Sequence, residues 1–401
     1  MNKRALSAIF LVVFIDLLGF GIILPLLPYI AERYQANAFQ IGLLAATYSF
    51  FQFLSAPIMG RLSDRYGRKK LLLISQFGSV LGYILLGLAH SLPLLFVSRI
   101  IDGITGGNIS IAQAYIADVT TPKDRAKGMG LIGAAFGLGF AIGPALGGIL
   151  FKLGGFSLPA FFAAFIGLVT MTITALILKE TVNVAKEKVS PRAKFSFREL
   201  VTVLLTHPIG LIIVAFFFIN FAFSAMQGTF ALWAQDRLGF GPSQIGLIFT
   251  YVGIGAIITQ LLILPRVVDR FGERPVFIYG TLLLSLGLLV IPFSYHVALL
   301  LVGNSLLILG NGLANSTSQS IASENVSREE YGGTLGILQS GASLGRILGP
   351  VIGGYLYNLV NPNTPYFVSA GIVFVMFLIL RTSLVREPAF LPKLRQKVLR
   401  S

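Results

Sequence analysis

Four ionisable side chains lie inside long apolar stretches of this 401-residue chain: Asp16, Arg99, Asp102 and Arg346. Charge is costly where water is excluded, so residues of this kind are functional candidates by default. Arg99 and Asp102 are three positions apart, which places them on one helix face where they can pair. Loss of water favours the neutral form of an acid, so Asp16 could bind and release a proton near neutral pH. The chemistry indicated is proton binding, with Asp16, Asp102 and Arg99 as candidates.

Each of these residues also has a structural interpretation. Arg99 and Asp102 could be a self-satisfied pair that fixes one helix, and Asp16 could be a hydrogen-bonded structural acid. Arg346 has no obvious partner in the sequence, so it could face carboxylates across a cavity or an anionic substrate. Seven amides could line a substrate path or join neighbouring helices, and with Asp16 and Arg346 they complete the candidates for substrate binding: Gln52, Asn108, Gln113, Asn220, Gln227, Asn311 and Asn315.

The composition indicates which elements hold these residues. The chain is 55% hydrophobic and only 12% charged, with a mean hydropathy of +0.82, whereas soluble domains carry about 25% charged residues. A bilayer-spanning helix needs about 20 apolar residues. We therefore predict an all-α membrane protein with twelve transmembrane helices, at 5–28, 40–62, 71–89, 93–117, 126–151, 158–178, 207–234, 243–267, 275–294, 297–322, 331–357 and 365–384.

The distribution of basic residues predicts the orientation. Most of the 31 Lys and Arg residues fall on one side of the predicted bundle, which places both termini in the cytoplasm. The net charge of +15 is then a topology signal that also attracts anionic membrane lipids, and nucleic acid is not expected as a partner. Lys3 and Arg4 before the first apolar stretch resemble a signal peptide, but no small-residue cleavage site follows, so we expect a retained helix. We expect a multi-pass monomer of a bacterial inner membrane.

One charged segment occurs twice in the chain. GRLSDRYGRKK at 60–70 returns as PRVVDRFGERP at 265–275, and each follows an apolar stretch that opens with Gln-Ile-Gly-Leu, at Gln40 and at Gln244. Likewise, GFAIGPALGG at 139–148 returns as GRILGPVIGG. Duplicated halves are common among secondary transporters, whose substrate sites lie where the halves meet.

The long polar segment 179–206 separates these copies and predicts the domain organisation. Two pseudo-symmetric six-helix halves, 1–178 and 207–401, are expected on either side of a cytoplasmic linker. Glycines four residues apart share a helix face, so the duplicated Gly-Pro segments predict smooth grooves for close helix packing, with prolines that could kink or break the helix.

Four motifs give the chain a resemblance to a known family. The segment 60–70 resembles the loop 2–3 signature of the major facilitator superfamily. Pro25 and Pro28 after Leu-Gly-Phe-Gly resemble the first-helix signature of its drug:proton antiporter branch. RIIDGITGG at 99–107 and GFAIGPALGG at 139–148 resemble that branch's signatures in helices 4 and 5. The resemblance covers the whole chain and is nearest to bacterial tetracycline and multidrug efflux pumps. Acidic residues that some of those pumps carry in helices 3 and 9 are absent from both spans here.

The resemblance implies a charge cluster that latches the cytoplasmic side in the outward-facing state. In physical terms, Gly60 and Gly67 permit a tight turn, and the planar donors of Arg68 could bridge Asp64 and Asp118. A preference for positive charge on the cytoplasmic side is enough to explain the basic residues of this loop, but it does not explain its acidic residues. The expected gating residues are Gly60, Asp64, Arg65, Gly67, Arg68, Asp118, Gly139, Gly143, Pro144, Gly147 and Gly148.

Other function classes lack support in the sequence. The three histidines are scattered, and neither a His-Glu-x-x-His segment nor a phosphate-cradling Gly-Lys-Ser/Thr loop occurs, so an enzyme, a metal site and a cofactor are not expected. No repeated selectivity filter indicates a channel. The prediction is a proton-coupled transporter that exports amphipathic small molecules by alternating access. The alternatives are a lipid or glycolipid exporter (flippase) of the same fold, and a non-transporting membrane receptor or scaffold.

Overall fold

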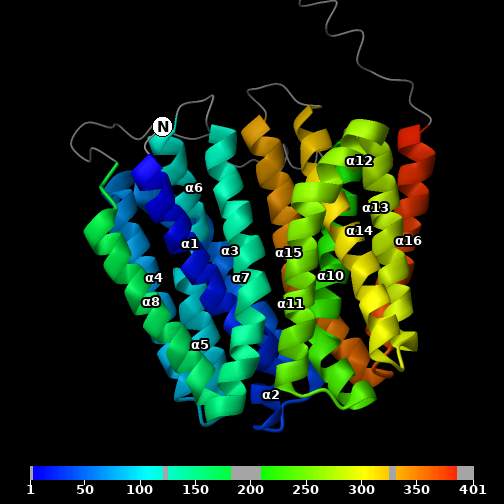
Figure 1. Cartoon of the computed structure of the whole chain (residues 1–401), viewed down its shortest axis with the longest axis horizontal. Helices are drawn as coiled ribbons and strands as arrows, with labels where there is room; N and C mark the ends of the chain where they lie inside the picture. The colour runs from blue at the N-terminus through cyan, green and yellow to red at the C-terminus, as the bar shows by residue number, and fades with distance from the viewer. Residues whose placement is uncertain (1–2, 121–124, 182–208, 325–330, 386–401) are drawn as a thin grey trace, which may run out of the picture.

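The computed structural model describes residues 3–120, 125–181, 209–324 and 331–385, which form a bundle of helices without strands (Figure 1). The predicted linker lies outside the described residues from position 182 onward. In chain order the elements are α1 (Lys3–Ile23), η1 (Leu24–Leu26), α2 (Leu27–Glu32), α3 (Ala38–Tyr66), α4 (Arg68–Gly87), α5 (Leu92–Thr105), α6 (Asn108–Val119), α7 (Arg125–Gly154), α8 (Ser157–Ile177), α10 (Ile209–Leu238), α11 (Pro242–Ile258), η2 (Thr259–Ile263), α12 (Leu264–Phe271), α13 (Glu273–Val290), η3 (Ile291–Phe293), α14 (Val297–Glu324), α15 (Tyr331–Leu359) and α16 (Thr364–Val385).

The helices agree with the predicted membrane protein. Within the described residues, 11 helical segments are long and apolar enough to cross a membrane. The 29-residue α15 is not one of these 11 but lies in the same bundle, and it carries many glycines, several polar residues and Arg346. Each of the twelve predicted spans therefore coincides with a helical segment, and the all-α prediction is confirmed.

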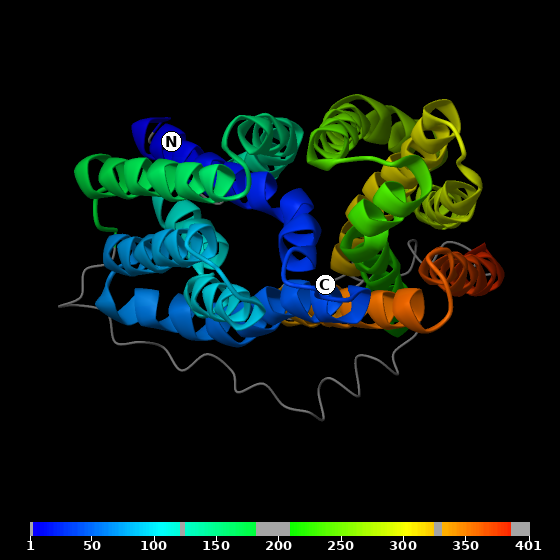
Figure 2. The same cartoon turned by 90° about the horizontal axis from the view of Figure 1, so that it is seen from below.

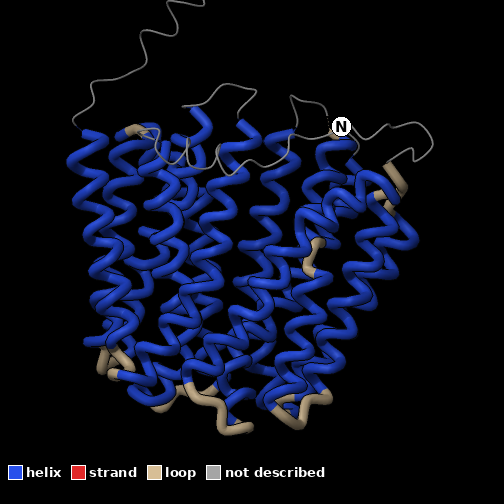
Figure 3. The backbone as a smooth tube through the Cα atoms, turned by 180° about the vertical axis from the view of Figure 1, so that it is seen from behind, coloured by secondary structure: helices blue, strands red, loops and turns tan. Residues whose placement is uncertain are grey.

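Three spans predicted as single helices are interrupted. The fourth span is divided into α5 and α6 at Gly106 and Gly107, and Figure 3 shows this break as a loop segment at mid-height of the bundle. The first span contains a 3₁₀ turn at Pro25, and the eighth contains the π-helical turn η2 just before Pro265. Proline at the first turn of a helical segment is tolerated because its missing N–H has no intrahelical partner there.

The prolines of the duplicated Gly-Pro segments behave differently. Pro144 lies inside α7 and Pro350 lies inside α15, and both helices continue through them. A helix break at these prolines does not occur, since membrane helices tolerate proline where neighbouring helices pack against it.

The helices pack as two sets. One buried apolar cluster draws all its core residues from 6–178, and the largest draws all of its own from 209–384, with Trp233 fully buried. The two sets meet along two helix pairs, α3 with α15 and α7 with α11. Figure 2 shows these pairs side by side where the sets approach each other. The repeated segments of the sequence therefore lie at the interface between the sets.

Candidate functional site

The two interfacial helix pairs are built from the same duplicated residues. The carbonyl of Pro350 lies so close to Gly42 that a Cβ there would overlap it. At the other pair, a Cβ on Gly246 would lie 2.5 Å from the carbonyl oxygen of Pro144. Gly42 and Gly246 are the glycines of the two Gln-Ile-Gly-Leu segments, and the prolines belong to the two Gly-Pro segments. Glycine is needed at both crossings because the backbones touch.

The glutamines of the same segments begin their helices. The side-chain oxygen of Gln40 accepts a hydrogen bond from the Asn37 N–H at 3.0 Å, and that of Gln244 accepts one from the Gly241 N–H at 3.1 Å. Each glutamine thereby satisfies a backbone donor at a helix start. The repeated Gln-Ile-Gly-Leu pattern thus combines a helix cap with a contact point for the opposite set.

The opposite end of these helices lacks such close contacts, and we call it the open end. A Cβ built at any of four glycines near that end, on α3, α7 and α15, would meet nothing within 4 Å: Gly60, Gly130, Gly133 and Gly336. By contrast, a Cβ at Gly148 would lie 3.2 Å from the Pro242 carbonyl. The space between the sets is therefore closed at the end that holds the Gln-Ile-Gly-Leu caps. At the end that carries the segment 60–70, α7 and α11 spread apart (Figure 1), and the glycines named above contact no neighbouring helix.

Arg68 links two acids at the open end, as the sequence predicts. Its guanidinium lies 2.5 Å from Asp64 Oδ1 and 3.1 Å from Asp118 Oδ2, and it donates to Ser63 Oγ at 2.6 Å. Only 7% of Arg68 is exposed, so these charge-assisted bonds are shielded from water. Gly67 has a φ of 102°, which glycine adopts without strain. The exposed Arg65 instead lies over the Tyr66 ring at 5.3 Å and takes no part in this network.

Glu180 belongs to the same network and was missed by the sequence analysis. Its carboxylate accepts from the backbone N–H groups of Arg68 at 2.7 Å and of Lys69 at 3.2 Å. A carboxylate at the first N–H groups of α4 is stabilised by the helix dipole. Thr181 donates to Asp118 Oδ2 at 2.9 Å and connects the end of the sixth span to the cluster. The sequence signal was an acid just after the end of a span, in the segment predicted to be linker.

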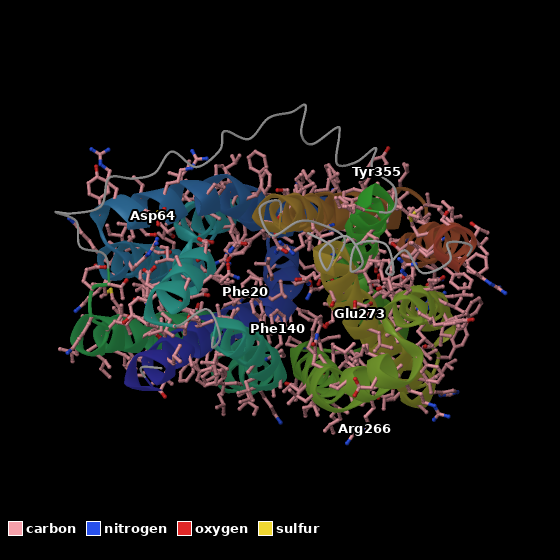
Figure 4. All side chains as sticks on the ribbon, turned by 90° about the horizontal axis from the view of Figure 1, so that it is seen from above. Phe20, Asp64, Phe140, Arg266, Glu273 and Tyr355 are labelled. Atoms are coloured by element: carbon pink, nitrogen blue, oxygen red, sulfur yellow. The ribbon has the colours of Figure 1, made fainter. Side chains whose placement is uncertain are left out.

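The second copy of the charged segment lacks this network in the described residues. Glu273 occupies the position that Arg68 holds in the first copy, and its Oε1 accepts from Ser320 Oγ at 2.5 Å. Asp269 is exposed, and Arg266 donates to the Leu262 carbonyl. Figure 4 shows Asp64 and Glu273 over different sets of helices.

Arg99 and Asp102 form the predicted pair in the interior. Arg99 Nη1 lies 3.2 Å from Asp102 Oδ2, both residues are 3% exposed, and the guanidinium lies 5.9 Å from the Tyr83 ring centre. Ser79 bonds the Asp102 carboxylate. A Cβ on Gly82 would lie 2.9 Å from Asp102 Cβ, so α4 and α5 pack tightly around the pair. This enclosure is what the structural interpretation of the pair requires.

Asp16 has a different environment. It is half-buried on α1, and among the described residues its Oδ2 atom is inaccessible and lacks a hydrogen-bond partner. Phe20 lies four residues further on the same helix face. Its ring centre is 5.4 Å from that of Tyr48 and 5.9 Å from that of Phe140. Figure 4 shows Phe20 and Phe140 near the centre of the bundle, so the face of α1 that carries Asp16 also carries a ring of this central aromatic group.

Arg346 lies on α15, in the other set of helices. Its guanidinium donates to Ser343 Oγ at 2.9 Å, and the ion pairs within the described residues do not include it. Tyr48 of α3 is within its electrostatic reach. Arg346 therefore faces the first set of helices across the interface, and its charge is uncompensated by any described carboxylate.

Four of the seven candidate amides take part in two hydrogen-bonded groups, and three do not. Gln52 donates to the Tyr48 hydroxyl at 2.8 Å and to the Gly106 carbonyl at 3.1 Å, which stabilises the break between α5 and α6. In the second set, Asn315 accepts from Asn220 at 3.3 Å and donates to Asn311 Oδ1 at 2.7 Å. The structure does not bring the others into these groups: Asn108 with an unpartnered Oδ1 among the described residues, the exposed Gln113, and the half-buried Gln227.

Metal-binding geometry is absent from the described part of the chain, where no three His, Asp or Glu side chains gather. The arrangement places an acid with an unpartnered oxygen in one set of helices and an arginine outside the described ion pairs in the other. It can bind protons, hydrogen-bonding groups and aromatic rings.

Known proteins similar to this chain are membrane transporters. Multidrug resistance protein 2 of Bacillus subtilis is 30% identical over 373 residues, 91% of each chain. The class E tetracycline resistance protein of Escherichia coli is 30% identical over 396 residues, 95% of each chain. The crystal structure of the human organic anion transporter MFSD10 (TETRAN) is similar with a TM-score of 0.72 and 25% identity, over 94% of this chain and 99% of that one. The Major Facilitator Superfamily profile matches residues 9–241 and 228–399, and the chain belongs to this family.

Proposed function

We propose that this transporter exports amphipathic small molecules in exchange for protons by alternating access. The observation that carries the proposal is the contrast between the two ends of the interface. Gly42 and Gly246 touch the opposite set at the closed end, while Gly60 and Gly336 meet nothing at the other. Relatives named for multidrug and tetracycline resistance support export as the direction.

The proton site in this proposal is Asp16, with Asp102 and its partner Arg99 as the reserve. Asp16 borders the opening and has an unpartnered oxygen among the described residues, whereas Asp102 already has Arg99 and Ser79. A proton on Asp16 removes the cost of an unpaired carboxylate away from water. Release of that proton prepares the site for a ligand.

The moving parts in this proposal are the two halves, 1–178 and 207–401, which rock about the crossings of the Gly-Pro segments with 179–206 as their linker. The smooth faces of Gly139, Gly143 and Gly147 on α7 pack directly on α1, so that pair moves as one unit. The Arg68 cluster forms the gate at the open end. Positive charge on the loops makes this end cytoplasmic, in a bacterial inner membrane.

Reconstituted vesicles with an imposed pH gradient test the proposal. Wild-type protein is expected to accumulate a lipophilic fluorescent dye or antibiotic against its gradient, with opposite proton movement. Asp16→Asn keeps shape and hydrogen bonding but cannot titrate, so uphill accumulation should vanish while exchange without a gradient persists. Asp269→Asn, at an exposed acid of the second charged segment, is the control.

The possible outcomes assign the role. If Asp16→Asn still pumps uphill and Asp102→Asn does not, proton coupling belongs to the buried pair. If both variants pump like wild type, proton exchange through these acids is wrong.

A further inference from the structure

Asp16 and Arg346 place opposite charges on the two sets of helices. Asp16 belongs to α1 of the first set and Arg346 to α15 of the second. Within the described residues neither takes part in an ion pair, so no nitrogen–oxygen contact of 4.0 Å or less joins them. The contrast with Arg99 is direct, because Arg99 has its own acid 3.2 Å away.

Tyr48 lies near charged residues of both sets of helices. Its phenol is within electrostatic reach of Asp102 and Arg99 first, and then of Asp16 and of Arg346 from the second set. Gln52 donates to the phenol oxygen at 2.8 Å, which leaves the phenol proton free to donate to a ligand. The rings of Tyr48 and Phe20 are 5.4 Å apart. Aromatic rings therefore lie near both the acid and the guanidinium.

We propose that this site binds zwitterionic amphiphiles, with the cationic group at Asp16, the anionic group at Arg346 and an aromatic body against Phe20 and Tyr48. The proposal rests on the proton-coupled export proposed above and specifies its substrate class. A ligand of this kind supplies the missing partner of both charges at once. A ligand with one charge leaves either the acid or the guanidinium uncompensated, which is costly away from water.

The same arrangement accounts for exchange with protons. The cationic group and a proton compete for the Asp16 carboxylate, so binding of the ligand releases the proton into the open end. The anionic group on Arg346 takes no part in that competition. One ligand therefore exchanges for one proton at Asp16. The charge of Arg346 is balanced only while the ligand is bound.

A ligand series on one aromatic scaffold tests the proposal by binding to the purified full chain in detergent. Four compounds carry an ammonium alone, a carboxylate alone, both groups, or neither. We expect the compound with both groups to bind at least about tenfold tighter than either singly charged compound, since a hydrogen-bonded charge contributes about that factor. Binding of this compound should release protons from wild type.

Two variants assign the charges. In Arg346→Gln, the affinity for the doubly charged compound should fall to that for the ammonium compound. In Asp16→Asn, it should fall to that for the carboxylate compound, and proton release should disappear. Arg237→Gln removes an exposed arginine stacked 5.7 Å from the Tyr295 ring at the closed end and should leave the preference unchanged. Arg346→Lys, which keeps the charge, should retain most of the preference and serves where Arg346→Gln does not fold.

Other outcomes overturn the proposal. Equal affinity of wild type for the ammonium and the doubly charged compounds would remove Arg346 from ligand binding. A preference that survives in folded Arg346→Gln would do the same. If the predicted binding pattern holds but vesicles show no uphill transport, the zwitterion site stands and proton-coupled export fails. If uphill transport occurs with singly charged cations preferred, export stands and the zwitterion site fails.

Discussion

The two copies of the charged segment share a sequence pattern but not a network. In the first copy Arg68 bridges Asp64 and Asp118, and Glu180 caps α4 below it. In the second copy the position of Arg68 is taken by Glu273, which bonds Ser320. Both copies keep the glycine with positive φ, at 102° and 79°. Both also keep an arginine that lies over the aromatic ring of the next residue.

This difference separates what the turn requires from what the charge cluster requires. Glycine, the stacked arginine and the aromatic residue are common to both copies, so they belong to the turn between two helices. Asp269 matches Asp64, but the second copy has no counterpart of Arg68, so the bridge between acids occurs in the first copy alone within the described residues. The first set of helices therefore holds the charge cluster of the open end, in addition to Asp16 and Asp102.

The largest effect is expected from the acid of the first copy. Asp64→Asn removes the carboxylate that Arg68 contacts at 2.5 Å and should lower transport strongly while expression and folding stay near wild type. A change of about 1–3 kcal/mol confined to one state shifts populations roughly five- to a hundredfold. Transport in reconstituted vesicles measures the effect.

Asp269→Asn is the matched control in the second copy. Asp269 is exposed, so its replacement should change transport less than twofold, because a substitution away from a packed or networked site costs within about 0.5 kcal/mol. Equal losses in the two variants would mean that both copies act as gates and that the asymmetry has no functional role.

A different effect is expected from the crossings that close the other end. In Gly246→Ala the new Cβ would lie 2.5 Å from the Pro144 carbonyl oxygen, so the closed arrangement should be destabilised by about 1–3 kcal/mol. Single cysteines at exposed positions of that end should become more reactive to a membrane-impermeant thiol reagent.

Gly133→Ala provides the comparison at the open end of α7, where a Cβ meets nothing within 4 Å. Reactivity at the closed end should not rise in this variant, because the added methyl group has room in this state. If both alanine variants gave the same labelling, the contrast between closed and open ends would be lost.

Much of the fold was predictable from the sequence because apolar length alone determines where helices can cross a bilayer. The break at Gly106 and Gly107 was not, since Gln52 from another helix satisfies the freed Gly106 carbonyl. The duplicated Gln-Ile-Gly-Leu and Gly-Pro segments predicted close packing. Their pairing across the interface depends on which helices meet, which a repeat does not specify.

The candidate site was predictable in part for a similar reason. The bridge from Arg68 to two acids followed from residue types and loop positions, and the pairing of Arg99 with Asp102 followed from their spacing. Glu180 was missed because it lies just after a helix that is distant in the sequence from α4. The setting of Arg346 opposite Tyr48 could not be predicted, because the rotation of one helix against another depends on all of its neighbours.

The smallest effect is expected from the helix cap beneath the first copy. Glu180→Gln keeps one acceptor for the backbone N–H groups of Arg68 and Lys69 but loses the charge, which should cost about 0.3–1 kcal/mol. The unfolding temperature of the purified protein should fall slightly. Glu273→Gln removes the corresponding charge at the start of α13, and a larger fall there would reverse the ranking of the two copies.

The central claim is that the two ends of the interface open in alternation, and paired spin labels measure this directly. The chain has no cysteine, so labels can be placed without background. One pair, at Gly60 and Gly336, spans the open end, and a second pair, at the exposed Arg33 and Arg237, spans the closed end. As substrate and an imposed pH gradient drive turnover, the account predicts a second population in which the first distance shortens and the second lengthens together. Distances that stay fixed, or that lengthen at both ends at once, would contradict it.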